Sequence, residues 1–121
     1  MLKKDLTLER KWNQLLAQLE KVIGKRPRDL YAVLFLIGIQ ELGQGVKRFT
    51  KEQKQDLIHI ALCKTLSLSK LYELEGVDED NWPHWKLVKK LPHVDLLEQE
   101  KLIKMHIIEY FEREVALNMT D

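Results

Sequence analysis

The sequence predicts an all-α fold, a four-helix bundle-like single domain with a long Trp-containing loop between the third and fourth helices. Leu30 to Ile39 forms a run without a charged or amide side chain. A helix of that composition has no polar face, so neighbouring helices must cover it. A regular apolar stripe precedes this run, and only five Gly and three Pro interrupt the 121 residues. These three observations favour long helices over many short strands.

The first helix is predicted over residues 7–24. Its apolar residues follow the i, i+4, i+7 spacing that makes one stripe on a helix: Leu8, Trp12, Leu15, Leu16, Leu19, Val22 and Ile23. Gly24 can adopt the left-handed conformation that closes a helix.

The second helix is predicted over residues 28–43, with Pro27 at its first turn and the segment Leu30–Leu42 as the central core. The apolar run is about half of the roughly 20 residues that a membrane span requires. A short connector to the first helix makes the two antiparallel neighbours, as in an up-down bundle.

The third helix is predicted over residues 50–75, opened by a capping box from Thr50 to Gln53. Hydroxyl side chains near Ser67 compete for backbone hydrogen bonds and allow a bend there. The fourth helix is predicted over residues 95–117, with Asp95 as its N-cap. Residues 76–94 form the irregular part between them, with a short helical turn expected over residues 84–90.

Composition limits the classes of partner and compartment. The net charge of +1 creates no overall field that attracts nucleic acid or a membrane surface, and we expect neither as a partner. The single cysteine, Cys63, excludes an internal disulfide and suits a reducing compartment. The charged start of the chain has no apolar signal core. A cytoplasmic location is therefore predicted.

Metal binding is the sharpest chemical hypothesis. Di-iron bundles use Glu and His at i and i+3. Asp56 and His59 on the third helix have this spacing with a shorter acid, and His106 and Glu109 on the fourth have it in the reverse order. However, a helical wheel places Glu52, Asp56, His59 and Cys63 within about 60° of one another, away from the apolar side. That arrangement is typical of a solvated face. The sequence therefore predicts no metal ion or cofactor, and the four-residue set remains an alternative.

His59 and Cys63 lie one turn apart, which is the spacing of a nucleophile and its base. No glycine turn that would form an oxyanion hole accompanies them, and a lone helical cysteine is more often a small filler of the core. We assign no catalytic residue.

The tetrapeptide Trp82-Pro83-His84-Trp85 has two interpretations. The indoles either seal one end of the bundle or form an aromatic platform for a ligand or peptide. With the outer aliphatic residues Leu102 and Met105 of the fourth helix, Trp82 and Trp85 are the candidates for a partner surface.

The same tetrapeptide takes part in a resemblance that covers roughly residues 29–112. Together with Phe49 through Gln53, Leu91-Pro92, Asp95, Glu98-Gln99-Glu100 and Ile107 through Phe111, it resembles a family of small uncharacterised bacterial helical proteins. The resemblance implies a helical fold and carries over no activity or cofactor. The expected function is a non-enzymatic interaction or assembly module with a protein partner or a second copy of the chain. The alternative is a metal- or small-ligand-binding helical bundle that uses Asp56, His59, His106 and Glu109.

Overall fold

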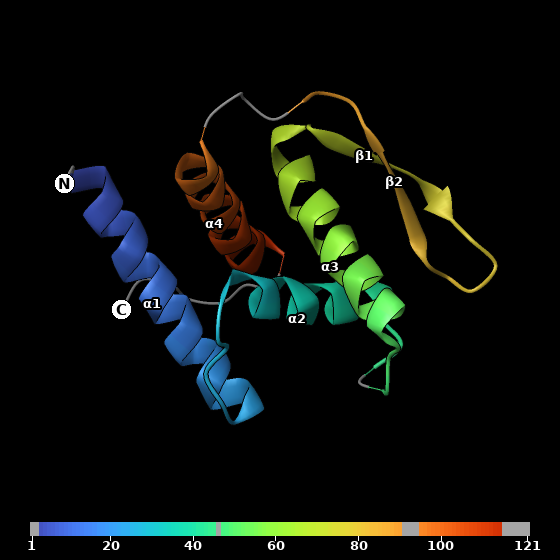
Figure 1. The fold of residues 1–121 in the computed structure, drawn as a ribbon, viewed down its shortest axis with the longest axis horizontal. Coiled ribbons are helices and arrows are strands. Elements are labelled where there is room, and N and C mark those ends of the chain that lie inside the picture. The colour runs from blue at the N-terminus through green and yellow to red at the C-terminus, as the bar shows by residue number, and fades with distance from the viewer. Residues whose placement is uncertain (1–2, 46, 91–94, 115–121) are drawn as a thin grey trace. The chain divides into compact units, whose positions relative to one another are not determined.

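The computed structural model describes residues 3–45, 47–90 and 95–114 (Figure 1). Its elements, in chain order, are α1 (Lys3–Ile23), α2 (Leu30–Leu42), α3 (Lys51–Leu66), the short 3₁₀ helix η1 (Ser67–Ser69), β1 (Tyr72–Val77), β2 (Pro83–Leu87) and α4 (Leu96–Arg113). The chain divides into two compact units. One holds α1 and α4, and the other, Asp29–His93, holds α2, α3 and the hairpin of β1 and β2.

The prediction of an all-α fold is wrong. The described residues form four α-helices, the short 3₁₀ helix and a two-stranded antiparallel sheet, so the fold is mixed α/β. The description as a helical bundle fails for the same reason. α3 ends at Leu66 and does not continue to residue 75. A helical turn was expected over residues 84–90, but β2 occupies residues 83–87.

The end of α3 explains this difference. Lys70 adopts a left-handed conformation (φ 62°) that glycine usually supplies at a helix end. The backbone N–H of Leu71 donates to the carbonyl of Leu66 at 3.3 Å, and that of Lys70 donates to Ser67 at 2.9 Å. These bonds close the helix and turn the chain into β1 beside α3 (Figure 1).

Apolar and polar residues then alternate along both strands, as a half-covered strand requires. In the antiparallel register, Tyr72 lies opposite Leu87 and Leu74 lies opposite Trp85, which places these four side chains on one face. The register shifts between Leu74 and Gly76.

Local capping signals position the helices. The Thr50 hydroxyl accepts the N–H of Gln53 at 3.1 Å, and the Gln53 side chain accepts the N–H of Thr50 at 2.9 Å, which confirms the predicted capping box. The predicted Asp95 cap is confirmed by a 2.9 Å bond from the N–H of Glu98. α2 begins later than predicted, because Asp29 caps it by accepting the N–H of Ala32 at 3.0 Å.

Close packing of α2 on α3 builds the core of the Asp29–His93 unit. A Cβ atom added to Gly38 would overlap the backbone carbonyl of Leu57, so only glycine permits this approach. Around the contact lies a core cluster with partly buried apolar neighbours: Leu42, Phe49, Leu57 and Ile60, joined by Phe35, Ile39 and Trp82. The apolar run of α2 is not covered on every side, since Tyr31 is 62% exposed.

α1 and α4 form the other unit. Trp12, Leu15, Leu16 and Leu19 of the predicted stripe are buried, whereas Val22 is 73% exposed. Lys104 of α4 lies over the Trp12 ring, with its Nζ 5.3 Å from the ring centroid and 3.7 Å from the Glu9 carboxylate. Residues 91–94 and 115–117, to which the predictions also extended, lie outside the described residues. Within the described ranges, each helix is too short or too polar to cross a bilayer.

Candidate functional site

A groove of about 450 Å³ lies between α3 and the β-hairpin. We call it the hairpin groove. Both of its walls belong to the Asp29–His93 unit. The described residues that line it are Gln53, Asp56, His59 and Ile60 of α3, and Asp78, Asp80, Trp82, Pro83, His84 and Trp85 of the hairpin.

The α3 wall follows from helical spacing. Gln53, Asp56, His59 and Ile60 recur at intervals of three or four residues, so they share one face of the helix. Asp56 and His59 are exposed, whereas Ile60 is buried and joins the core cluster. The wall therefore presents polar groups above an apolar base.

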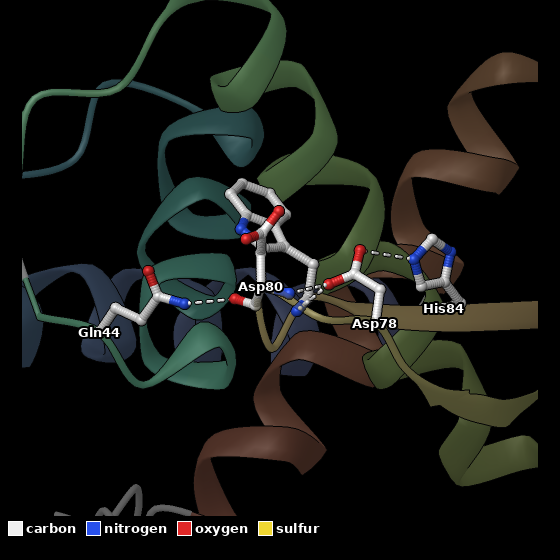
Figure 2. A network of polar contacts seen from close by, with 5 residues as sticks. Gln44, Asp78, Asp80 and His84 are labelled. Carbon is white, nitrogen blue, oxygen red and sulfur yellow. Dashed lines mark hydrogen bonds and ion pairs between the residues drawn. The ribbon is translucent and has the colours of Figure 1, made fainter.

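The hairpin turn is organised by Asp78. Its Oδ1 accepts the backbone N–H groups of Asp80 at 2.9 Å and Trp82 at 3.0 Å, which is the Asx-turn pattern. Its Oδ2 lies 2.9 Å from Nε2 of His84, as Figure 2 shows. The hydrogen bond from His84, followed by that from the Trp82 N–H, holds the pKa of the Asp78 carboxyl below its ordinary value. Asp78 is thus a structural acceptor for the turn.

A second bond ties this turn to the loop after α2. The side-chain amide of Gln44 donates to the backbone carbonyl of Asp80 at 2.9 Å (Figure 2), and Lys47 donates to the Gln44 side-chain oxygen at 2.6 Å. The hairpin tip is therefore held by the loop after α2 as well as by His84 of β2. This bond uses the backbone carbonyl of Asp80, so the Asp80 carboxylate takes no part in it.

Two indoles contribute to the hairpin wall. Trp82 packs against the core cluster and is fixed by it. Trp85 is half-buried, and its Nε1–H is buried without a hydrogen-bond acceptor among the described residues. Both indoles line the groove, so the aromatic tetrapeptide lies opposite the polar face of α3.

The His59 and Cys63 pair lacks a reactive thiol. Cys63 Sγ lies 3.4 Å from His59 Nε2, but Cys63 is fully buried, and burial raises its pKa to about 11. The expectation that Cys63 belongs to a solvated face is wrong. Tyr72 of β1 packs edge-on against His59 on this part of α3, and the hairpin was absent from the predicted fold. A thiol held protonated is a poor nucleophile.

No family model, curated protein or solved structure matches the chain.

The four residues of the metal hypothesis are divided between the two units. Asp56 and His59 line the hairpin groove, whereas His106 and Glu109 lie on α4. His106 Nδ1 donates to the Leu102 carbonyl at 2.7 Å, and Glu109 accepts from Arg113 at 3.5 Å. In the described part of the chain, no group of three or more His, Cys, Asp or Glu side chains is arranged to hold a metal ion.

The candidate residues of the predicted partner surface also come from both units. Trp82 and Trp85 line the hairpin groove, while Leu102 and Met105 line a smaller, mainly apolar groove of about 360 Å³ between α1 and α4. The candidate residues therefore line two grooves, one in each unit.

Sequence reasoning missed Gln53, Asp78, Asp80 and His84 as residues of the site. The signal for Asp78 and Asp80 was the acidic run that follows a stretch of alternating polarity from Tyr72 to Glu75. Interpreting that stretch as a strand would have placed the acidic run in a hairpin turn.

Proposed function

We propose that this protein is a non-enzymatic interaction module that binds a segment of a partner protein in the hairpin groove. The observation that carries the proposal is the groove itself, in which two indoles and a proline lie beside unpaired polar groups. Aromatic side chains supply large contact areas at little entropic cost and are enriched at protein interfaces.

The edge of the groove supports a macromolecular occupant. Leu74 lies opposite Trp85 and Val77 lies opposite Pro83 in the strand register, so both are neighbours of groove residues on the same face of the hairpin. Leu74 is 51% exposed and Val77 is 57% exposed. We call this pair the apolar rim. A partner segment that crosses the groove would cover the rim, whereas a ligand confined within the groove would leave it in water.

The charge of the groove argues against nucleic acid as the occupant, because the carboxylates of Asp56, Asp78 and Asp80 repel phosphate groups. We propose the cytoplasm as the compartment, since a chain with one cysteine suits a reducing environment.

A second candidate function is the binding of a small ligand in the same groove. The observation that favours it is that Asp56 and His59, two members of the predicted ligand set, both line the groove with the indoles. A small ligand would bind independently of the apolar rim, which separates the two functions experimentally.

Peptide selection tests the proposed function. A random library of peptides of about 12 residues, enough to cross a groove in extended form, is selected against the full-length chain, and the enriched peptides are measured for affinity. We expect Leu74→Thr combined with Val77→Thr to weaken their binding about tenfold, which corresponds to about 1.4 kcal/mol. Threonine is β-branched, a shape that strands favour, so the hairpin is preserved in both substitutions.

The matched control changes two exposed apolar residues in the other unit, Val22→Thr with Leu96→Thr. Peptide binding should be unchanged in this variant. A selection whose peptides bind the rim variant as tightly as the original chain contradicts the proposal. Sedimentation of both chains distinguishes self-association, since a dimer that is lost only in the rim variant would assign the groove to a second copy.

A further inference from the structure

The charge of the hairpin groove differs from that of the chain as a whole. The protein has 20 Lys and Arg residues and 19 Asp and Glu residues, so its charges nearly balance. The described groove lining holds three aspartates, two histidines and no lysine or arginine. The groove is therefore a local region of negative charge with aromatic walls.

The three carboxylates are not equivalent. Asp78 uses both oxygens on the turn and on His84. The Asp56 and Asp80 carboxylates have no hydrogen bond or ion pair with any other described residue. One of them stands on the α3 wall and the other on the hairpin turn. Two uncompensated carboxylates thus face the groove from opposite walls.

The aromatic wall favours the same kind of ligand. The faces of indole rings attract cations, and the attraction grows when the cation leaves water. Trp82 is held in place by the core cluster, so its ring needs no reordering when a ligand binds. Carboxylates on two walls and indoles on one form a site suited to a single positive charge with an extended apolar stem.

We propose that the hairpin groove binds a lysine or arginine side chain of the partner segment, held between the Asp56 and Asp80 carboxylates and the indoles of Trp82 and Trp85. This inference rests on the proposed function and names the chemistry of its partner. The apolar rim selects a peptide source for the cation, because Leu74 and Val77 gain contacts only if apolar residues flank the basic one. The occupant is a short basic segment with hydrophobic neighbours.

The test starts from the peptides enriched in the library selection and measures the composition of that pool. We expect Lys or Arg at one position of the enriched peptides, and replacing it by Gln should weaken binding about tenfold. Raising the salt concentration from about 0.05 M to 0.5 M should weaken the Lys or Arg peptide more than the Gln peptide, because salt screens charge pairs near the surface.

Two variants of the protein locate the effect. Asp56→Asn with Asp80→Asn should remove most of the preference for Lys or Arg over Gln. Glu52→Gln with Glu79→Gln removes the same number of charges from α3 and from the hairpin turn, but neither residue lines the groove, so the preference should remain. Thermal denaturation checks that both variants are folded. We expect little loss of stability in either variant, because none of the four carboxylates is paired in the described structure.

The outcomes separate this inference from the proposed function. If Gln and Lys peptides bind equally, or if both double variants lose the preference alike, the basic anchor is wrong and the interaction function stands. If no peptide depends on the rim, both are wrong. Nα-acetyl-lysine N-methylamide, whose side chain stays charged, is the third probe. If this small amide binds as tightly as the whole peptide, the cation need not come from a peptide and that part of the inference is wrong.

Discussion

The two sides of α3 use opposite principles of packing. On the side of α2, Gly38 lets the two backbones meet and a dry apolar cluster fills the remaining space. On the side of the hairpin, polar side chains stand on the helix face, and the strands leave a groove of about 450 Å³. The same helix thus has one face whose residues maximise contact and one whose residues keep a volume open. The closely packed face of α3 stabilises the fold, and the face that borders the groove is the one proposed for recognition.

Gly38→Ala should cause the largest loss of stability, because it changes the close contact between α2 and α3. The added methyl group would overlap the Leu57 carbonyl, and a backbone atom cannot rotate away. Overpacking of this kind costs about 3 kcal/mol, although alanine is the better helix former. Thermal denaturation followed by circular dichroism measures the loss.

Gly43→Ala is the matched comparison for that experiment. Gly43 closes α2 in a left-handed conformation (φ 70°), and a Cβ atom there meets nothing within 4 Å. Gly43→Ala should lower the stability by about 1 kcal/mol, because alanine is strained in the left-handed conformation. Equal losses in the two variants would show that the close contact between α2 and α3 does not exist in solution.

Cys63 tests how well the hairpin side of α3 excludes water. With a pKa of about 11 in place of 9.0, the thiolate fraction at pH 8 falls about 100-fold. Alkylation by iodoacetamide should be slower in the folded chain than in denaturant by at least that factor. Because Cys63 is the only cysteine, the rate reports this site alone. Rapid alkylation of the folded chain would mean that the hairpin separates readily from α3.

The raised pKa of Cys63 also makes the stability of the folded chain depend on pH. Between about pH 9 and 11 the unfolded chain ionises Cys63 and the folded chain does not, so the free energy of unfolding falls as the pH rises through this window. Cys63→Ala should remove that part of the alkaline loss of stability.

The smallest effect is expected at the hairpin turn. His84→Gln removes the largest cause of the lowered pKa of Asp78, so the carboxyl midpoint should move upward, towards the ordinary aspartate value of about 3.9. A carboxyl-detected NMR titration of both chains measures this midpoint. An unchanged value would mean that the Asp78–His84 contact does not persist in solution.

Ionised Asp78 stabilises the turn, and its lowered pKa fixes the sign of the pH dependence. Its contribution is complete above the unfolded-state pKa and is lost as the pH falls through the lower folded-state value. Protection of the turn amides against hydrogen exchange should therefore decrease at acid pH in the original chain. It should depend less on pH in Asp78→Asn.

Features set by neighbouring residues were predictable from the sequence. The capping box at Thr50, the Asp95 cap and the glycine stop at Gly24 all depend on side chains within four positions. The hairpin was not predicted, because Leu68, Leu71 and Tyr72 continue a helical spacing and the stop at Lys70 uses a residue with no special turn signal. The strand alternation of Tyr72 to Glu75 was visible but short, and a short apolar pattern fits either structure.

The site required the hairpin, and this is why sequence reasoning divided it. Asp56 and His59 belonged to the metal hypothesis, whereas Trp82 and Trp85 belonged to the partner surface. Only the return of the chain along α3 brings the two pairs to one groove. Helical spacing alone could not have revealed this, because the two pairs are more than 20 residues apart in sequence.

The bond between Gln44 and Asp80 has a consequence for how this surface can change during evolution. The acceptor is the peptide oxygen of Asp80, which every amino acid retains. A substitution at position 80 can therefore replace the side chain at the proposed partner contact while the hydrogen bond that holds the turn is retained. Under the proposed function, single codon changes at this position would alter the binding preference of the groove without a new scaffold.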